Sequence, residues 1–552
     1  MDVRLVMLGD SAWLVEWQEG GGLDSRLAEV HAAVRRLNAS AERPNGVLGV
    51  IGGYDSLVVR HDPLAVDSGQ LRDWILRELA EVDSREVAQG AIHEIPVCYG
   101  DGRDLARMAE ETGLTEREVV ALHCGADYTV AVIGFAPGFP YLTGLPEALR
   151  VPRLATPRKR VNGGSVAIAG EQAGIYPCDS PGGWHVLGRT DAVLFDPARV
   201  GREALLEAGD RVRFVPVDGI EPGGKPAGGG IRGCGENPEC RSVEVLAPGF
   251  STTVQDAGRP GYEHAGVSPG GVLDREAMRV ANMLLGNAED AAVLEMAVKG
   301  PVLKFGGDSR VVLAGARAEG IPQPGRVLEV WAGDVLDVGA LLDSSRAVLA
   351  VEGGTEVPLV MGSRATDVRG RFGGVDGRKL ETGDVLATGA VRPAKLPPAV
   401  DGVGLAKPVG LELELRLLEG PQADWFGEEV LKRFFSEAYE VTARQDRTGM
   451  RLHGAGLEIR DGSRQMRSQP VATGSVQIPP DGRPMVLMAE RQTHGGYPQI
   501  GCVITADMPC LARAMPGARV RFRRVCAAEA RAALAKMEWD FALLRAGLMC
   551  RS

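Results

Sequence analysis

The sequence predicts a mainly β protein with α+β parts, built from two β-barrel halves that each carry an accessory α/β domain. Three observations predict this. Glycine supplies 74 of the 552 residues, about 13% against a usual value of roughly 7%, and its spread along the chain fits many tight turns between strands. Apolar residues make up 44% and charged residues 24%, as in folded globular proteins. The third observation is an internal repeat.

The repeat consists of three short blocks that occur in the same order in both halves of the chain. Each half has a Gly-Ser turn into an apolar strand, then a Gly-Gly segment, then an Arg-Val-Arg-Phe strand. The blocks are GSVAI (164–168), GGWHVLG (182–188) and AGDRVRF (208–214), and then GSVQI (474–478), GGYPQIG (495–501) and PGARVRF (516–522). Chance hardly produces three such matches in order, so we expect two β-barrels of common design.

The first half begins with alternating strand and helix patterns. A chain of this length needs several cores. Residues 57–59 form a short apolar run typical of a strand, and 69–82 have helical spacing. Further on, Thr115 and Glu118 form a capping box in front of a helix, and glycine turns and strands follow. We therefore expect an α/β domain at 1–88 and a barrel at 89–217.

The second half is separated from the first by a Gly-rich linker without apolar periodicity, which we place at 218–242. A helix is expected at 275–285, because Asp274 is a good N-cap and Gly286 a good C-terminal stop. The last segment has an amphipathic helical pattern. The expected domains are a first domain at 243–405, a barrel at 406–526 and a C-terminal helix at 527–552.

Charge and cysteine content exclude several classes of protein. A net charge of −11 argues against a nucleic-acid-binding surface. No apolar run reaches the ~18 residues that cross a membrane, and Asp10 and Glu16 near the start do not fit a secretory signal. Nine cysteines without close spacing fit a reducing, cytoplasmic location. Cys234 and Cys240 alone are a weak metal signal, so we expect no metal site.

In the first half, a rigid loop, a basic run and a histidine are the candidate site. Two prolines and two glycines among aromatic residues form a shaped loop that fits the lining of a pocket, although a buried connection between strands explains it equally well. The basic run fits anion binding or a solvated face. The histidine, in a Gly-rich turn, fits an acid–base role, although a lone histidine is more often structural. The pocket-lining candidates are Phe135, Pro137, Phe139, Tyr141 and Trp184; the anion-binding candidates are Arg158, Lys159 and Arg160; the acid–base candidate is His185.

In the second half, the richest polar segment runs from residue 477 to residue 497. It places a carboxylate, a guanidinium, an amide, a hydroxyl and an imidazole within eight residues, which a purely structural strand rarely does. Arg447 belongs to a separate charged cluster upstream. The catalytic candidates are Glu490 and His494, the substrate- or phosphate-binding candidates are Arg447, Gln477, Arg491, Gln492 and Thr493, and Tyr497 is expected to line a pocket.

These motifs resemble two known families that together cover nearly all of the chain. Residues 4–217, through IPVCYG, GFAPGFPYL, TPRKRV and SPGGWHVLGRT, resemble the KipI-like family, which comprises the B subunits of 5-oxoprolinase and is also called allophanate hydrolase subunit 1. Residues 243–525, through PGFSTTVQDAGRPGYEHAGVSPGGVLD, GSRATD, RTGMRL and AERQTHGGYP, resemble the KipA-like family, which comprises the C subunits, or allophanate hydrolase subunit 2. The fused pair also resembles the carboxyltransferase region of urea carboxylase. The resemblance implies a cyclophilin-like β-barrel in each half.

The resemblance implies the two fused subunits of an ATP-dependent 5-oxoprolinase, acting on a small amide or lactam with ATP and Mg²⁺. The chain has no biotin-attachment, ATP-grasp or amidase signature, so a separate LamB/YcsF-like protein, the A subunit of the enzyme, is the implied partner. The basic run and Arg491 would then hold phosphoryl and carboxylate groups, and His185 or His494 would move protons. We expect both barrels to share one site, with the basic run facing the ERQTHGGY segment.

Two other functions stay open on the same resemblance. A biotin-dependent carboxyltransferase, related to urea amidolyase, would need a separate biotin carrier, because no covalent biotin site lies on this chain. A KipI/KipA-type regulator would bind a histidine kinase and needs no turnover. A homo-oligomer is compatible with each of these functions.

Overall fold

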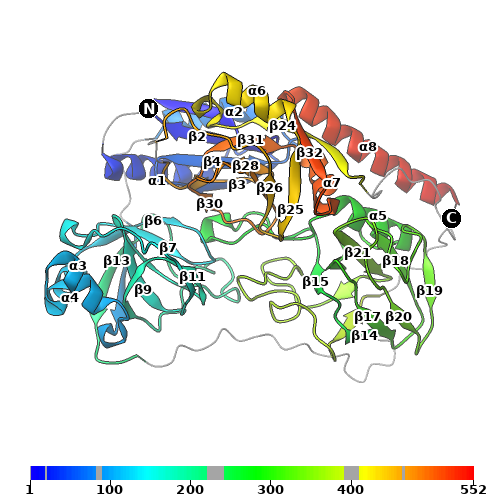
Figure 1. Cartoon of the computed structure of the whole chain (residues 1–552), viewed down its shortest axis with the longest axis horizontal. Helices are drawn as coiled ribbons and strands as arrows, with labels where there is room; N and C mark the ends of the chain where they lie inside the picture. Colours follow the sequence, from blue (N-terminus) through cyan, green and yellow to red (C-terminus); the bar gives the residue numbers. More distant parts are fainter. Residues whose placement is uncertain are drawn as a thin grey trace.

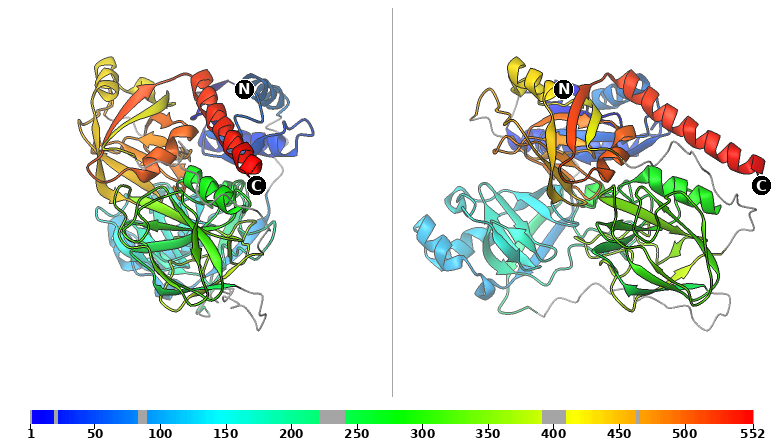
Figure 2. Two further views of the ribbon diagram at one scale, coloured as in Figure 1. Left: turned by 90° about the vertical axis from the view of Figure 1, so that its right-hand side faces the viewer. Right: turned by 45° about the vertical axis from the view of Figure 1, so that its right-hand side comes forward.

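The computed structural model describes residues 2–18, 22–82, 90–220, 241–390, 409–462 and 466–551. Figure 1 shows four folded units and a long C-terminal helix. The N-terminal unit and the C-terminal barrel lie together on one side, and the two middle units lie side by side beneath them; Figure 2 shows the same arrangement from two further directions. No helix among the described residues is both long and apolar enough to cross a membrane. Most of the expected linker falls outside the described residues.

The N-terminal unit is a four-stranded antiparallel sheet of order β1-β2-β4-β3 with two helices. The predicted second helix is confirmed: it begins beside Asp67, whose carboxylate accepts from the backbone N–H groups of Gly69 and Gln70. The elements are β1 (Val3–Met7), β2 (Ala12–Trp17), α1 (Leu23–Ala39), β3 (Val47–Gly52), β4 (Ser56–His61) and α2 (Ser68–Ala80).

The first barrel is a seven-stranded sheet of order β12-β9-β10-β7-β6-β13-β5. Two backbone hydrogen bonds between Cys98 and Arg189 join the two edges, at the ends of β5 and β12. The predicted capping box of Thr115 and Glu118 is present at the start of α4. The elements are β5 (Ile92–Val97), α3 (Leu105–Thr112), α4 (Glu116–Cys124), β6 (Tyr128–Ile133), β7 (Pro140–Thr143), β8 (Arg158–Val161), β9 (Ser165–Ala169), β10 (Gln172–Ile175), β11 (Ser180–Gly182), β12 (His185–Arg189) and β13 (Arg211–Pro216), with β8 and β11 paired separately.

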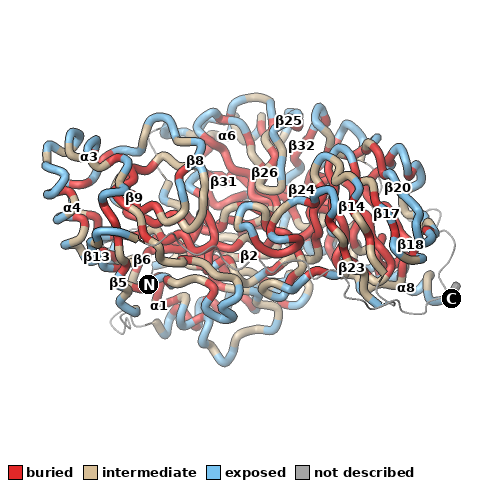
Figure 3. The backbone as a smooth tube through the Cα atoms, turned by 90° about the horizontal axis from the view of Figure 1, so that it is seen from below, coloured by how far each residue is buried: buried red, intermediate tan, exposed pale blue. Residues whose placement is uncertain are grey.

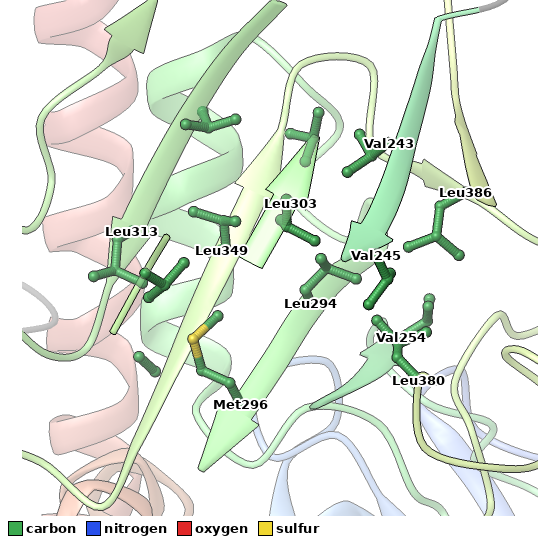
Figure 4. Packing of buried hydrophobic residues seen from close by; sticks show 14 of the residues in the cluster. Val243, Val245, Val254, Leu294, Met296, Leu303, Leu313, Leu349, Leu380 and Leu386 are labelled. Atoms are coloured by element: carbon green, nitrogen blue, oxygen red, sulfur yellow. The ribbon is translucent and has the colours of Figure 1, made fainter. Parts of the chain in front are cut away.

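The third unit, which we call the sandwich unit (residues 241–390), consists of two five-stranded antiparallel sheets with one helix, α5. The sheets are β20-β17-β14-β23-β22 and β15-β16-β21-β18-β19, and one apolar core fills the space between them, as Figure 4 shows. This accessory unit is therefore richer in β-structure than the α/β domain that we expected. The elements are β14 (Ser242–Ala247), β15 (Ser251–Gln255), α5 (Arg275–Leu285), β16 (Val293–Ala297), β17 (Val302–Phe305), β18 (Ser309–Ala314), β19 (Leu328–Val330), β20 (Val335–Asp337), β21 (Arg346–Val351), β22 (Thr355–Glu356) and β23 (Val385–Thr388).

The second barrel is closed, with order β24-β31-β28-β29-β26-β25-β32 and pairing of β32 back to β24. The C-terminal helix α8 was predicted and packs Phe541 against the α5 side of the sandwich unit. The elements are β24 (Glu412–Glu419), α6 (Glu428–Ser436), β25 (Tyr439–Gln445), β26 (Gly449–His453), β27 (Gln469–Pro470), β28 (Ser475–Gln477), β29 (Met485–Leu487), β30 (His494–Gly495), β31 (Gln499–Val503), α7 (Met508–Arg513), β32 (Arg519–Arg524) and α8 (Ala527–Arg551).

The two barrels have the same strand order, which confirms the repeat as a structural one. Reading from the strand after each Gly-Gly block, the first barrel runs β12-β9-β10-β7-β6-β13-β5 and the second β31-β28-β29-β26-β25-β32-β24. The Arg-Val-Arg-Phe strand pairs in parallel with the opening strand of its barrel in both cases. The repeated sequence blocks therefore mark equivalent strands.

The units pack crosswise. The sheet of the N-terminal unit packs on the second barrel rather than on the first, through an apolar cluster that joins Leu8, Leu14 and Val58 to Ala472 and Cys502. The first barrel contacts the sandwich unit, where the Gly138 N–H donates to the Ala265 carbonyl at 2.9 Å. Figure 3 shows buried chain running continuously through the middle of the molecule. Each half therefore covers part of the other.

Candidate functional site

All four units meet at residues 489–495 of the second barrel, which we call the junction segment. The sandwich unit reaches it through Ser268, whose hydroxyl donates to the Arg491 carbonyl at 2.6 Å, and through the Gly270 N–H, which donates to the Ala489 carbonyl at 3.1 Å. The N-terminal unit reaches it at His494, whose Nε2 lies 2.8 Å from the Gly52 carbonyl. This segment is where the sequence is richest in polar groups.

The first barrel touches the junction segment through the start of its aromatic loop. A Cβ placed on Gly134 would lie 2.7 Å from His494 Nδ1 and 3.3 Å from Thr493 Oγ1. Only a residue without a side chain allows this approach. The first barrel therefore meets this segment through its aromatic loop and not through the basic run that we expected to face it.

The basic run of the first barrel does not face the junction segment as expected. Arg158 is held by Asp104 of the same barrel in a two-point ion pair, with N–O distances of 2.9 and 2.5 Å, and Arg160 pairs with Asp179 at 2.7 Å. Lys159 is exposed on the same strand. Two of the three predicted anion-binding cations are thus already neutralised by acids of their own barrel, which the sequence pattern alone did not show.

The predicted pocket-lining aromatic residues form a core cluster of the first barrel. Phe139 lies at the centre, with its ring 4.9 Å from Tyr141 and 5.7 Å from Trp184 between ring centroids. Phe135 has a left-handed backbone conformation, with φ of 65°, and packs edge to face on Phe139 at 5.4 Å. This is the buried connection that the sequence left open. Pro137 of the same loop is buried, and Tyr497 is exposed on the second barrel.

The two candidate histidines lie in different environments. His185 is buried in β12 of the first barrel, where its Nε2–H donates to the Pro152 carbonyl at 3.0 Å. In His494, burial lowers the pKa to about 4, so the ring is neutral near pH 7. Its Nδ1 lies 3.0 Å from Thr493 Oγ1 and its Nε2 faces a carbonyl. Both ring nitrogens of His494 are therefore engaged in holding the units together.

Glu490 belongs to a buried ion-pair cluster between the second barrel and the sandwich unit. Arg447 donates from Nε to Glu490 at 2.6 Å and from Nη1 to Glu295 on β16. Arg346 adds a second cation, 3.6 Å from Glu295. Burial opposes the charge of Arg447, but the two carboxylates outweigh it and raise its pKa. The cluster contains two guanidinium groups and two carboxylates, so its charges cancel. Arg447 therefore pairs with protein carboxylates rather than with a ligand.

A second buried polar group, which we call the amide set, consists of Gln477, Gln499 and Arg491. The side chains of these three residues are at most 1% exposed. Within the described part of the chain, both amide atoms of Gln477 and of Gln499, and two guanidinium nitrogens of Arg491, have no hydrogen-bond partner. Buried polar groups are nearly always paired, so this set is what a polar ligand or water would satisfy.

Two further predicted residues, Gln492 and Thr493, follow Arg491 directly in the junction segment. Gln492 is half-buried, and its carbonyl accepts from Arg491 Nη1 at 3.2 Å. The sequence interpretation missed Gln499 and Glu295. It also missed Gln422, whose amide oxygen accepts from the Gln499 N–H at 3.1 Å. A polar residue in the apolar block GGYPQIG was the available signal for Gln499, whereas Glu295 comes from another unit. Among the described residues, no group of three or more His, Cys, Asp or Glu side chains is placed to hold a metal ion.

Two sequence families match the chain in succession. The family "Carboxyltransferase domain, subdomain C and D" matches residues 3–206, and "Carboxyltransferase domain, subdomain A and B" matches residues 265–524. A solved structure, that of TTHA0988, superposes with a TM-score of 0.79 at 36% identity and covers 95% of this chain and 100% of that one. Both halves are therefore also united in a solved chain of this fold.

Curated relatives cover each half separately. The C subunit of the 5-oxoprolinase of Escherichia coli K12 is 35% identical over 285 residues, 51% of this chain and 90% of that protein. The B subunit of the 5-oxoprolinase of E. coli O157:H7 is 42% identical over 219 residues, 39% of this chain and 95% of that protein. The urea amidolyase of Lachancea kluyveri is 29% identical over 306 residues, 51% of this chain but 17% of that protein. The chain therefore belongs to the carboxyltransferase-domain family and is homologous to the B and C subunits of 5-oxoprolinase.

Proposed function

We propose that the chain is the fused B and C subunits of an ATP-dependent 5-oxoprolinase, which opens 5-oxoproline to glutamate together with a separate LamB/YcsF-like A subunit. The similarity to nearly the full length of both relatives supports this. The single observation that carries the proposal is the junction segment, where both halves of the chain meet beside one buried polar set. A shared site explains why two subunits act as one chain.

The proposed reaction requires a site that binds a small lactam and a means of activating its amide. 5-Oxoproline carries a carboxylate and an unreactive cyclic amide, and phosphorylation of the amide oxygen by ATP would turn that oxygen into a leaving group. Arg491 and the two glutamines supply a cation and paired amide donors and acceptors. They fit the substrate.

Three of the cations that were predicted to hold phosphates are not free to bind ATP. Arg158, Arg160 and Arg447, which were predicted to hold phosphates, are bound by protein carboxylates. We therefore derive no step through ATP on this chain, and its place in the assembled enzyme belongs to the proposal.

A reconstitution assay tests the function. The full chain is mixed with its LamB/YcsF-like partner, ATP, Mg²⁺ and 5-oxoproline, and glutamate and ADP are measured. We expect glutamate and ADP to form together only when all components are present. Mixtures without ATP and mixtures without the LamB/YcsF-like partner serve as controls. Absence of glutamate from the complete mixture would overturn the proposal.

A carboxyltransferase is the second candidate, favoured by the descriptions of both matching families and by the similarity to urea amidolyase. It would need a biotinylated carrier from another protein. A carboxylated carrier protein, with urea or 5-oxoproline as acceptor, is the discriminating reagent. Transfer of labelled carboxylate to either acceptor would favour this candidate, whereas avidin-insensitive glutamate formation favours the 5-oxoprolinase. Binding of a histidine kinase, with no turnover in either the glutamate assay or the carboxylate-transfer assay, would favour the KipI/KipA-type regulator.

A further inference from the structure

The outer face of the second barrel carries a polar pair in a fixed register. On neighbouring strands β28 and β31, Gln477 lies directly opposite Gln499, and Ser475 lies opposite Cys502. Directly opposed residues share one face of a sheet. Val476, between the two β28 residues, belongs to the core inside the barrel. The two glutamines therefore point away from the barrel core.

The N-terminal unit covers this face. Cys502, on the same face as the glutamines, packs in one cluster with Leu8, Ala12 and Leu14 of that unit, and Gln422 beside Gln499 donates from its amide to Glu16 of β2 at 3.3 Å. The backbone N–H of Gln499 donates to the Gln422 amide oxygen at 3.1 Å. The side-chain amides of Gln477 and Gln499, in contrast, find no partner among the described residues.

Arg491 supplies a buried cation near the face that carries Gln477 and Gln499. It belongs to the same junction segment as Gly495, which packs directly against the Gln477 side chain, and its charge also opposes the rise in pKa that burial causes in the Cys502 thiol. Among the described residues, Arg491 finds a hydrogen-bond partner for Nη1 alone, which donates to the neighbouring Gln492 carbonyl. Arg491 forms no ion pair with any carboxylate in the described part of the chain. It stays charged at neutral pH because burial lowers its pKa only to about 10.

The first barrel shows that the barrel fold does not require this polar pair. The repeat aligns Ala167 with Gln477 and Val186 with Gln499, and Ala167 and Val186 are likewise directly opposed on β9 and β12. Both barrels even have the same register shift after this pair. In the first barrel the pair is apolar and lies in the aromatic cluster. One fold thus carries an apolar pair in one copy and two unpaired amides in the other.

We propose that Gln477, Gln499 and Arg491 together bind a small cyclic amide that carries a carboxylate, the chemical class of 5-oxoproline. This rests on the proposed function and assigns the substrate to the second barrel. A lactam presents an N–H donor and a carbonyl acceptor side by side, and each glutamine amide offers the complementary pair. The Arg491 guanidinium binds the carboxylate. Gly495 allows the strand β30 to approach, because a Cβ there would lie 2.4 Å from Gln477 Nε2.

The experiment measures ligand binding to the full chain alone, without ATP or the LamB/YcsF-like partner. The probes are 5-oxoproline, proline, 2-pyrrolidinone and urea, and the readouts are calorimetric titration and the ligand-induced shift in Tm. We expect 5-oxoproline to bind. 2-Pyrrolidinone lacks the carboxylate and proline lacks the lactam carbonyl, so both should bind at least about tenfold more weakly, as unpaired buried groups require.

The variants Gln477→Met and Gln499→Met separate a ligand site from a structural role. Each removes unpaired amide atoms at similar volume, so we expect an unchanged or higher Tm without ligand and at least about tenfold weaker binding of 5-oxoproline. The control is Gln172→Met, which loses a 2.6 Å bond to the Tyr54 hydroxyl. It should lower Tm and leave binding unchanged.

Each result supports or overturns the proposal. A lower Tm for both glutamine variants, with 5-oxoproline binding intact, would make the pair structural. Tight binding of urea but not of 5-oxoproline would overturn the assigned substrate class. Glutamate formation in the reconstituted enzyme with normal rates in both variants would reject this site and keep the proposed function. Binding that both variants abolish, in a chain that makes no glutamate with the LamB/YcsF-like partner, would keep the site and reject the function.

Discussion

Replacement of Arg447 by methionine tests whether charge holds the second barrel to the sandwich unit. The side chain is 11% exposed, and it binds Glu490, Glu295 and the Gly271 carbonyl at once. The variant leaves two buried carboxylates with Arg346 as the remaining cation of the cluster. Removal of one partner from a buried ion pair typically costs about 3–5 kcal/mol, and we expect a destabilisation of this size at pH 7.

The loss should depend on pH in a defined direction. Burial raises the pKa of Glu490, and Arg447 opposes this rise. Without Arg447 the folded-state pKa rises further above the unfolded value, so the protonated form stabilises the variant at low pH and this stability is lost as pH rises through the folded-state pKa. The difference between wild type and variant should therefore shrink as pH falls from 7 to 5.

Differential scanning calorimetry is the suitable assay, because a chain with several cores need not unfold in one step. The shift of the transition that includes the second barrel is the quantity to compare. The double variant Arg447→Met with Glu490→Gln removes one charge of each sign and should be more stable than Arg447→Met alone. If the stability of Arg447→Met lies within about 0.5 kcal/mol of wild type, the range of ordinary surface substitutions, the reasoning is refuted.

Three further predictions follow from other contacts. Burial lowers the pKa of His494 to about 4, so its contribution to stability is present above pH 6.5 and is lost as pH falls to 4; the stability advantage of wild type over His494→Gln should shrink by about 3 kcal/mol across that range in pH-dependent denaturation. Gly134→Ala should lower Tm, since overpacking costs about 1–3 kcal/mol, whereas Gly22→Ala, whose Cβ meets nothing within 4 Å, should not; equal Tm values would contradict this. Arg158→Met should also lower Tm, because it leaves the buried Asp104 carboxylate without its cation; an unchanged Tm with lost turnover would instead make Arg158 a ligand-binding cation.

Local sequence signals predicted local structure well. Asp274 and Gly286 mark the two ends of α5 as expected. The Asp274 carboxylate accepts from the Ala277 N–H, and Gly286 has the left-handed conformation. A cap and a glycine stop act within one turn of their own helix, so four or five residues contain the whole interaction. The repeat worked for a similar reason, because turn and strand patterns are written in consecutive residues.

The partners of charged residues were not predictable in the same way. Arg158, next to two other cations, looks like a free anion site in the sequence. Its partner Asp104 lies 54 positions earlier, at the start of α3. A buried ion pair depends on which elements the fold brings together, and a run of like charges carries no information about that. Glu295 and Arg447, 152 positions apart, give the same lesson for the second half.

The amide set shows what the repeat could and could not reveal. The alignment of the two repeats alone pairs Gln477 with Ala167 and Gln499 with Val186, so a polar pair in place of an apolar one is visible in the sequence itself. Its burial is not, because the N-terminal unit that packs on the same face at Cys502 lies more than 400 positions away. In the first barrel an aromatic loop of its own covers the equivalent pair. The two barrels therefore share a fold but differ in what packs on the same face: residues of its own aromatic loop in the first barrel, and the N-terminal unit in the second. Under the proposed assignment of the substrate to the amide set, this packing gives a physical reason for B-type and C-type parts to act as one unit, whether as separate subunits or as a single chain.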